Sequence, residues 1–584
     1  MAIGCVVLIT GILVTTTLSQ ELLKNHDLEG TANWDCYSIQ CQATSDHRSG
    51  TQAVKATGRH NFYEGPSQNV WVKEHHTYTF EGWAKLLTDN GKGQSLELEV
   101  EYSLKNGQKS YVNVAHHYNM RVNSGWVHLI GSFITPGSLD HIRVYFQGPE
   151  PGVEFIADGA SLTDQSSGHQ SSGNWKAQTS ERIDRLRKSN IHFKVTTDHG
   201  VNPNSVTIET VMYKHAFPFG TAVVASIMNN NNGGSDQKYR QFIYDHFNWA
   251  VVENALKWRQ LEYSEGHPTY DTAVNAIKTM RNHGIKVRGH NLIWAVEQFV
   301  PGWLKSKSPS DVRRIVDHHL HEIVGRLKGL VEHWDVNNEM LHGNWYATKL
   351  NDPDYTKGVF QTVHSIDPNV KLFLNDYNVV ANGQSTDNYL AQAKDYKSSG
   401  THVGGIGVQC HFGENQYPDF YSINSRLDKL AHAGLPIWVT ELDVQSNDVN
   451  KRADFYDAAL RTFFSHSAVG GIMFWGFWSE HHWRGESAAL VSGPEFKMNA
   501  AGQKFLDLIH TEWKTYNSHI LSKGSAFTVR GFRGDYVVRV KVNGDTPSTH
   551  STSHSAKVTT MLIFMLMLKV DIKAFRDNKL TTEH

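Results

Sequence analysis

Short apolar runs alternate with amphipathic helical patterns between residues 217 and 477, and this alternation restricts the possible folds more than any other feature of the chain. The predicted strands lie at 217–223, 247–254, 286–291, 333–339, 371–376, 405–411, 436–441 and 471–477. Eight strand–helix units over roughly 300 residues are what a (β/α)8 barrel requires. A doubly wound open sheet is the alternative, but no glycine-rich phosphate-binding loop follows any of these strands. The pattern therefore predicts a C-terminal (β/α)8 TIM barrel.

The helix predicted between the third and fourth strands has the clearest pattern. Apolar residues recur there at helical spacing, at positions 312, 315, 316, 320, 323, 324 and 327. Ser308 and Pro309, with Asp311 in the first turn, form a good start signal, because serine can cap free backbone N–H groups and proline fits the first helical turn. This segment supports the strand–helix alternation on which the barrel rests.

Polar residues gather at the C-terminal ends of the predicted strands, where a design for packing alone would place turn residues. In a barrel these ends share one rim, and the loops that follow them surround one cleft. A single carboxylate at a strand end usually faces solvent or caps the next helix, but so many polar ends together favour an active site. These residues are Glu253, Asn254, His290, Asn338, Glu339, Asn375, Asp376, Tyr377, Gln409, His411, Glu441, Asp443 and Trp475.

Glu339 and Glu441, on the fourth and seventh strands, are the predicted catalytic pair. Cleavage of a glycosidic bond needs one carboxyl group to protonate the departing oxygen and another to attack or stabilise the oxocarbenium-like centre. Across the mouth of a barrel the two carboxyl groups could approach to roughly 5 Å, the separation expected for retention. Their pKa values should then move apart. His411 or Asp443 would orient Glu441 or favour its ionised form, and Asn338 can hydrogen-bond a sugar hydroxyl.

The segments WDVNNE, GIGVQCH, PIWVTELDV, RGHNLIW, FNWAVVENALKW and FWGFWSEHHWR occur in this chain in the order typical of glycoside hydrolase family 10, the endo-1,4-β-xylanases. Residues 179–514 resemble that family, in its plant- and animal-like branch. The resemblance implies that Glu339 is the acid/base and Glu441 the nucleophile. It also implies substrate contacts, with hydroxyls held by Asn254 and Lys257 and rings stacked on tryptophan faces. The implied cleft residues are Glu253, Asn254, Lys257, His290, Trp294, Gln409, His411, Trp475 and Trp483.

The chain departs from the family at one cleft position and after the barrel. Many relatives carry a histidine after the tryptophan of the third-strand motif, whereas this chain has Ala295, which places substrate preference more than catalysis in question. The segment FTVRGFRGDYVVRVKV is similar to a C-terminal hairpin of the plant-like branch. We place the catalytic domain at 181–545 and a tail without an assigned role at 546–584.

Residues 20–162 consist of short alternating segments separated by NG, SG and PG turn signals, which predicts an antiparallel, jelly-roll-like β-sandwich. GRHNFYEGP, YTFEGWAKL, GWVHLIGSF and FIADGASL resemble carbohydrate-binding modules of families 22 and 4/9. The candidates for sugar binding are Arg59, Trp83, Tyr102 and Tyr118, although core packing or a buried salt bridge would explain each of them equally well. A Ser/Gly/Gln-rich linker is predicted at 163–180.

Composition limits the classes of ligand and cofactor that the protein is expected to bind. The balance of 56 Lys+Arg against 58 Asp+Glu favours a neutral partner over nucleic acid. The 34 histidines show no H-E-x-x-H or Cys/His ligand spacing, so we expect neither a metal nor another cofactor. Residues 1–19 resemble a secretory signal peptide, which predicts an extracellular protein. Cys36 and Cys41 could close a small loop. The apolar run 561–568 is far shorter than the roughly 20 residues of a membrane span.

Together these features predict a secreted, monomeric, retaining endo-1,4-β-xylanase that binds plant cell-wall polysaccharide. Two alternatives remain open. The same site could cleave β-1,4-glucan or mixed-linkage glucan, because the sequence does not show how much room the cleft leaves for the C6 hydroxymethyl group that xylose lacks. The chain could instead be a polysaccharide-binding protein without activity, although both candidate carboxylates are present.

Overall fold

The computed structural model describes residues 21–543, except 37–38, 75, 92, 165–173, 198–200, 384, 415 and 522–524, and beyond them the backbone of 552–553, 561–565 and 568–574. The chain forms two compact units, one of Met1–Ala115 and Asn119–Ser172, the other of His116–Tyr118 and Gly173–His584. The predicted signal peptide and residues 165–173 of the predicted linker lie outside the described residues.

The first unit is a sandwich of two antiparallel sheets, as predicted. One sheet has the order β1-β2-β9-β4-β7, with β1 Gln40–Thr44, β2 Ala53–Thr57, β9 Phe155–Asp164, β4 Thr77–Leu86 and β7 Val127–Ile134. The other has the order β3-β8-β5-β6, with β3 Ser67–Val70, β8 Leu139–Gln147, β5 Gln94–Leu104 and β6 Lys109–Met120. The nine strands of these two sheets lie within residues 20–164, and β4 through β8 belong to the short alternating segments from which the sandwich was predicted.

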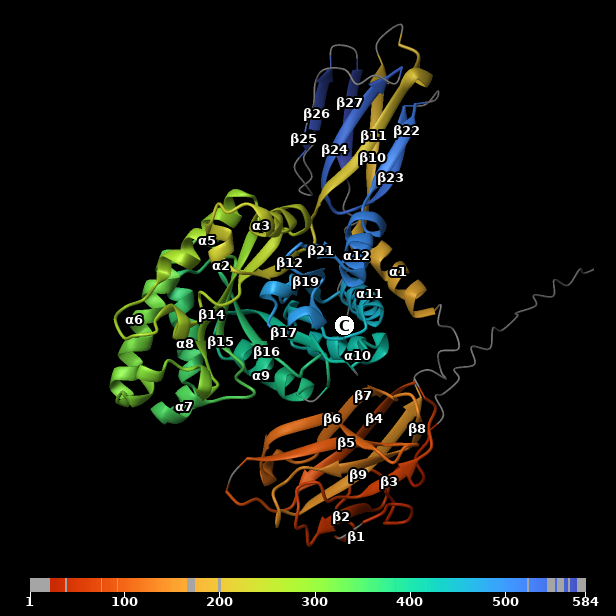
Figure 1. Ribbon diagram of the computed structural model, residues 1–584, viewed down its shortest axis with the longest axis vertical. Helices are drawn as coiled ribbons and strands as arrows, with labels where there is room; N and C mark the ends of the chain where they lie inside the picture. Colours follow the sequence, from red (N-terminus) through yellow and green to blue (C-terminus); the bar gives the residue numbers. More distant parts are fainter. Residues whose placement is uncertain are drawn as a thin grey trace, which may run out of the picture. The chain divides into compact units, whose positions relative to one another are not determined.

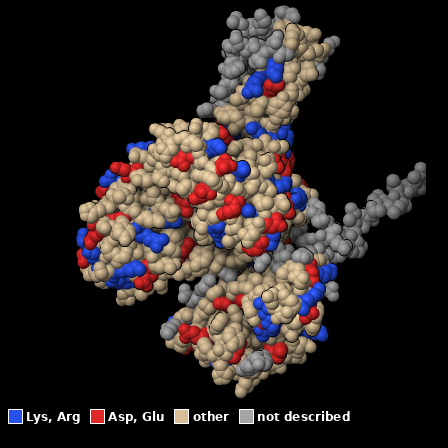
Figure 2. All heavy atoms as spheres, in the orientation of Figure 1, with Lys and Arg blue, Asp and Glu red and all other residues tan. Residues whose placement is uncertain are grey.

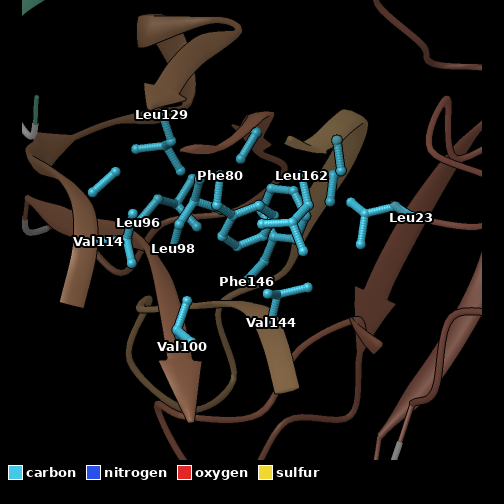
Figure 3. Packing of buried hydrophobic residues seen from close by; sticks show 14 of the residues in the cluster. Leu23, Phe80, Leu96, Leu98, Val100, Val114, Leu129, Val144, Phe146 and Leu162 are labelled. Atoms are coloured by element: carbon cyan, nitrogen blue, oxygen red, sulfur yellow. The ribbon is translucent and has the colours of Figure 1, made fainter. Parts of the chain in front are cut away.

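Alternation along β5 decides which side chains enter the core of this unit. Leu96, Leu98 and Val100 are fully buried and pack with Phe80 and Phe146 (Figure 3). The glutamates between them point to the opposite face of the sheet, because successive side chains of a strand point to opposite sides. A disulfide joins Cys36 to Cys41, and Cys410 in the second unit is free and buried.

The centre of the second unit is a closed barrel of parallel strands in sequence order, so the (β/α)8 prediction is confirmed (Figure 1). Each predicted strand corresponds to a barrel strand. Their bounds are β12 Phe219–Val223, β13 Trp249–Val252, β14 Lys286–Trp294, β15 His333–Asn338, β16 Lys371–Asp376, β17 Val403–Phe412, β18 Ile437–Val444 and β19 Val469–Phe474.

Helices between the strands cover the outside of the barrel. The predicted helix is α6, Pro309–Leu327, and the Ser308 side chain accepts a hydrogen bond from the Asp311 N–H, as the start signal indicated. Its periodic apolar residues Val312, Val316 and Leu320 are buried. The other long barrel helices are α3 Gly234–His246, α5 Tyr270–Asn282, α8 Tyr355–Ile366, α9 Thr386–Ser398, α10 Phe420–Ala431 and α11 Val449–Ser465.

A second, smaller sandwich is built from chain segments on both sides of the barrel. Its sheets have the orders β23-β10-β27-β26 and β22-β11-β24-β25. The bounds are β10 Lys188–Thr197, β11 Val206–His215, β22 Tyr516–Ile520, β23 Ala526–Phe532, β24 Gly534–Val542, β25 Thr552–Ser553, β26 Met561–Met565 and β27 Leu568–Ala574. The last three strands lie in the predicted tail of 546–584.

The expected C-terminal hairpin takes a different form. β23 pairs with β10 and β24 pairs with β11, so the two consecutive strands belong to different sheets. The reason is that each carries apolar residues on one face: Val529 and Val540 enter a core shared with Phe193 and Ile208. If β23 and β24 paired with each other in one sheet, β10 and β11 would lose these two strands as partners.

Candidate active site

The predicted strand-end residues lie at the C-terminal ends of consecutive barrel strands or in the first residues after them. Glu339 directly follows β15, with a positive φ of 59°, and Glu441 lies within β18. Both carboxylates are buried, with 8% and 4% of the residue exposed. On the face shown in Figure 2, positive and negative side chains are interspersed, in keeping with the nearly neutral composition. The buried acidic pair therefore reflects the arrangement of residues at the barrel rim and not an excess of acidic residues in the chain.

Glu339 is held by two donors and has a raised pKa. Trp294 Nε1 donates to Oε2 over 2.8 Å, and Gln409 Nε2 donates to Oε1 over 3.1 Å. Burial raises the pKa of Glu339 to about 7, and the negative charges of Asp376 and Glu441 act in the same direction against the two hydrogen bonds. Glu339 is thus mostly protonated below about pH 7.

Glu441 has the opposite electrostatic environment. Asn375 Nδ2 donates to its Oε1 over 2.9 Å, and His411 Nε2 lies 3.3 Å from its Oε2. Burial alone would raise the pKa of Glu441, but the hydrogen bond from His411 and the nearby histidine charges outweigh it and lower the pKa below its ordinary value. Glu441 is therefore ionised where Glu339 is protonated.

His411 supplies positive charge beside Glu441. Its Nδ1 lies 3.0 Å from Asp443 Oδ2. Burial would lower the pKa of His411, but Asp443 and Glu441 raise it to about 9. Asp443 also accepts a hydrogen bond from Trp483 Nε1 over 2.7 Å and lies 3.2 Å from Arg484. His411 thus connects Asp443 to Glu441.

Side chains of β16 and β17 hold the two glutamates in place. Gln409 lies beside Glu441 in the register of β17 and β18, and its amide reaches Glu339. Asn375 donates to both Glu441 and Asn338 Oδ1, and its own Oδ1 accepts from Thr440. Gln409 thus holds Glu339 and Asn375 holds Glu441, from the two strands that lie between β15 and β18 in the barrel.

A half-buried lysine lies between the acidic pair and two tryptophans. Lys257 Nζ donates to Asn254 Oδ1 over 3.0 Å and lies 5.5 Å from the ring centre of Trp294 and 5.6 Å from that of Trp475. Burial lowers the pKa of Lys257, while Glu441, Glu253 and Glu339 oppose that shift. Burial raises the pKa of Glu253. This cluster combines hydrogen-bonding groups with aromatic faces, as a sugar site requires.

The remaining predicted cleft residues differ in exposure. His290 is buried, with Nδ1 2.9 Å from Asp335 Oδ2 and its ring 5.1 Å from Trp475. Trp483 is 55% exposed, so one aromatic surface faces solvent. The Tyr377 ring stacks on His342 at 3.7 Å. Asn338 Nδ2 is buried without a partner among the described atoms, in keeping with a donor to substrate.

Two features of this site were missed by sequence reasoning. Phe299 stacks on Trp294 at 3.8 Å and so supports the donor to Glu339. Asp376 was noted only as a polar strand end, but it pairs with His342 at 2.6 Å and raises the pKa of Glu339. His342 lies three residues after Glu339, at a position with no recognisable sequence pattern. Its contact with Asp376 could therefore not be predicted from the sequence.

Three of the candidate sugar-binding residues of the first unit take part in packing. Arg59 is buried, and its guanidinium donates to the carbonyls of Glu64, Pro149 and Val153 over 2.7, 2.8 and 3.2 Å. Tyr102 is 2% exposed. Trp83 lies between Arg48, 3.5 Å from the ring centre, and His128, stacked at 4.5 Å. The Tyr118 side chain lies outside the described residues. These contacts favour the packing alternative for Arg59 and Tyr102.

The outer face of the β3-β8-β5-β6 sheet carries a different set of polar and aromatic groups. Alternation places Glu97, Glu99 and Glu101 on this face, and the register sets Gln147, Tyr145 and Arg143 beside them. Asn113 and Gln147 both donate to Glu97, and Lys109 pairs with Glu101. Burial and the charge of Glu97 raise the pKa of Glu99 to about 7. Trp71 and Tyr111, 71% and 56% exposed, lie at the end of β3 and on β6.

Comparison with protein families decides the classification of the barrel. Residues 208–507 match the model of glycosyl hydrolase family 10. The chain belongs to glycosyl hydrolase family 10. Residues 20–152 match a carbohydrate-binding domain, in agreement with the resemblance predicted for the first unit.

Several curated proteins are similar to this family 10 chain. The anti-sigma-I factor RsgI6 of Acetivibrio thermocellus is 40% identical over 63% of the chain and 47% of that protein. Endo-1,4-beta-xylanase 2 of Arabidopsis thaliana is 31% identical over 83% of the chain and 44% of that protein. The crystal structure of TsXylA, an intracellular xylanase from Thermoanaerobacterium saccharolyticum, is 29% identical and covers 50% of the chain and 95% of its own, with a TM-score of 0.45. The chain spans about half the length of the first curated relatives it matches.

Among the described residues of this family 10 chain, no group of three or more His, Cys, Asp or Glu side chains is arranged to hold a metal ion. Within the same residues, every helix is too short or too polar to cross a bilayer.

Proposed function

We propose that the barrel hydrolyses internal β-1,4 bonds of xylan with retention of configuration, in a secreted monomer whose first unit binds the polysaccharide. The observation that carries this proposal is the opposite protonation of two carboxyl groups that interact electrostatically. Glu339 has a pKa raised to about 7, whereas hydrogen bonds from His411 and Asn375 lower the pKa of Glu441. A retaining glycosidase needs one protonated and one ionised carboxyl group in this arrangement.

In the first step Glu339 protonates the leaving oxygen and Glu441 attacks the anomeric carbon. This forms a covalent glycosyl-enzyme and releases the downstream part of the polymer. The attack removes the charge of Glu441, which is one of the charges that raise the pKa of Glu339. The pKa of Glu339 consequently falls, and its carboxylate becomes a base that can activate the water of the second step.

The bound sugar would be placed by the lysine and tryptophan cluster. Lys257 and Asn254 offer polar contacts for hydroxyls, and Trp294, Trp475 and Trp483 offer ring faces for pyranose C–H groups. Xylan is favoured as the substrate because the names of several relatives describe endo-1,4-beta-xylanases. A relative of 28% identity is named an exoglucanase, so comparing reducing-sugar release from xylan and from carboxymethyl cellulose is part of the test.

The decisive variant is Glu441→Gln. We expect hydrolysis of xylan to fall by at least about a thousandfold, because the neutral amide is a poor nucleophile, while binding to insoluble xylan persists. Glu322→Gln, a change at a half-buried residue that pairs with Arg326 on α6, is the matched control and should retain activity. Turnover by the Glu441→Gln variant near the wild-type rate would contradict the assigned mechanism. Mass analysis of the products would separate internal from terminal cleavage.

The name of the anti-sigma-I factor RsgI6 is not that of an enzyme, which keeps a non-catalytic polysaccharide-binding protein as the second candidate. This candidate predicts that the wild-type chain binds xylan without releasing reducing sugar, in which case Glu441→Gln would change nothing. Secretion is supported by the pattern of residues 1–19. N-terminal sequencing of protein recovered from the medium of expressing cells would test it.

A further inference from the structure

A pocket of about 410 Å³ lies behind the acid/base strand and outside the cleft described above. It is bounded by β15, by α7 (Trp345–Leu350), and by α8 and α9, and α8 packs against both α7 and β15 (Figure 1). Asn337 lines it and donates to Thr356 of α8, so its side chain faces the helices, while the next residue, Asn338, is bonded to Asn375 of the neighbouring barrel strand. The pocket therefore opens from the opposite side of β15 to the catalytic carboxylates.

The lining contains buried polar atoms without partners among the described residues. Asn337 Oδ1, the Tyr346 hydroxyl and Gln392 Oε1 all lack a hydrogen bond. Asn337 and Tyr346 are 2% and 1% exposed. Buried polar groups in native proteins are almost always hydrogen-bonded, so three such groups around one cavity indicate a molecule that completes them. Two of the three atoms are acceptors and the third is a hydroxyl, which suits a ligand rich in O–H donors.

The rest of the lining combines apolar surface with neutralised charge. Ala295, Met340 and the Tyr396 ring provide surface for C–H groups. The lysine of the lining, Lys357, is already paired with Asp354 and Asp395 over 2.9 Å each. A phosphate or carboxylate would find no free cation in this lining. The volume lies in the range of about 300 to 1,000 Å³ that is typical of small-molecule sites.

We propose that this pocket binds a free pyranose sugar. A pyranose presents hydroxyl donors at its rim and C–H groups on its faces, which matches the unpartnered acceptors and the aliphatic and aromatic walls. Ala295, the residue at which the chain departs from its family, was expected at the cleft but forms part of the wall of this pocket, and a larger side chain there would alter that wall. Ala295 and Met340 directly follow Trp294 and Glu339 in the chain. A bound sugar would therefore touch the neighbours of the acid/base, Glu339, and of the tryptophan that donates to it.

The test uses D-xylose as the probe and the full chain as the protein. Crystals soaked in D-xylose should show a sugar against Tyr346 and Gln392, separate from any sugar in the catalytic cleft. Calorimetric titration should detect a site that Gln392→Leu weakens by about tenfold, the effect expected for loss of one buried hydrogen bond. Ala295→Leu should abolish the same site. Gln361→Leu, on the exposed face of α8, is the matched control and should bind as the wild type does.

The proposal does not depend on catalysis, because Gln392 and Gln361 lie outside the catalytic machinery and both variants should hydrolyse xylan at the wild-type rate. An inactive wild-type protein that still binds D-xylose in the pocket would contradict the proposed function and leave this inference standing. Ordered water alone in the pocket of soaked crystals, or equal titrations for wild type and Gln392→Leu, would overturn it.

Discussion

At the scale of single residues, two side chains set the pKa of Glu339 in opposite directions. The charge of Asp376 raises it, and the hydrogen bond from Gln409 lowers it. The alkaline limb of kcat/KM, expected near pH 7, should therefore move to lower pH in Asp376→Asn and to higher pH in Gln409→Leu. Asp454→Asn, an exposed change on α11, should leave the limb in place. Shifts of the same sign in both variants would contradict the assignment of Glu339 as the acid.

The same carboxyl group should reduce stability above its unfolded pKa. The ordinary pKa is 4.5 and the folded value is about 7, so the folded state binds more protons between these pH values. Stability then falls as the pH rises through this window, by about 3 kcal/mol at most. Glu339→Gln should remove this fall. The melting temperatures of wild type and variant should be measured from pH 4 to 8. The variant should become increasingly more stable than the wild type as the pH rises, and two parallel curves of melting temperature against pH would contradict the raised pKa.

Residue identity at the strand ends was the part of the site that could be predicted. Glu339 and Glu441 stand at the ends of two short strand-like runs, and a barrel brings such ends together. Contacts of Phe299 with Trp294 and of His342 with Asp376 depend on loop conformations, which residue order alone does not determine. Arg59 illustrates the converse: a cationic residue suited to sugars is instead satisfied by backbone carbonyls.

At the scale of elements, Asn375 of β16 joins β15 and β18. Its amide bonds Asn338, Glu441 and Thr440 within the buried rim. Asn375→Leu has a similar shape but leaves these groups unpaired, so we expect a loss of about 2 to 4 kcal/mol in the free energy of unfolding. The acid limb of kcat/KM should also move to higher pH, because this hydrogen bond lowers the pKa of Glu441. Exposed Asn229→Leu should do neither.

Strand positions were predictable because each barrel strand is an apolar run between helices. Strand pairing beyond the barrel was not. β23 and β24 are separated by one residue, which normally indicates a hairpin, yet each pairs with a strand more than 300 residues earlier in the chain. Burial of Val529 and Val540 in a shared core decides the pairing, and that partner choice is not visible in either strand alone.

At the scale of the whole molecule, a binding unit attached to the barrel should matter only for insoluble substrate. Tethering raises the local concentration of polymer at the active site without new catalytic contacts. Trp71 and Tyr111 are exposed aromatics associated with the polar outer face of the β3-β8-β5-β6 sheet, so each can be truncated without opening the core. We expect Trp71→Ala and Tyr111→Ala to reduce binding to insoluble xylan by several-fold.

The same variants should hydrolyse short soluble xylo-oligosaccharides with unchanged kcat/KM, because these substrates reach the barrel by diffusion. Tyr213→Ala, at a tyrosine of β11 in the second unit that is 48% exposed, is the control and should alter neither property. An equal loss of hydrolytic activity on soluble and insoluble substrates would mean that the two aromatic residues stabilise the barrel and do not bind the polymer. If the variants bound insoluble xylan as the wild type does but hydrolysed it more slowly, the polysaccharide would not contact this sheet. The contact would then be sought in the cleft beside Trp483.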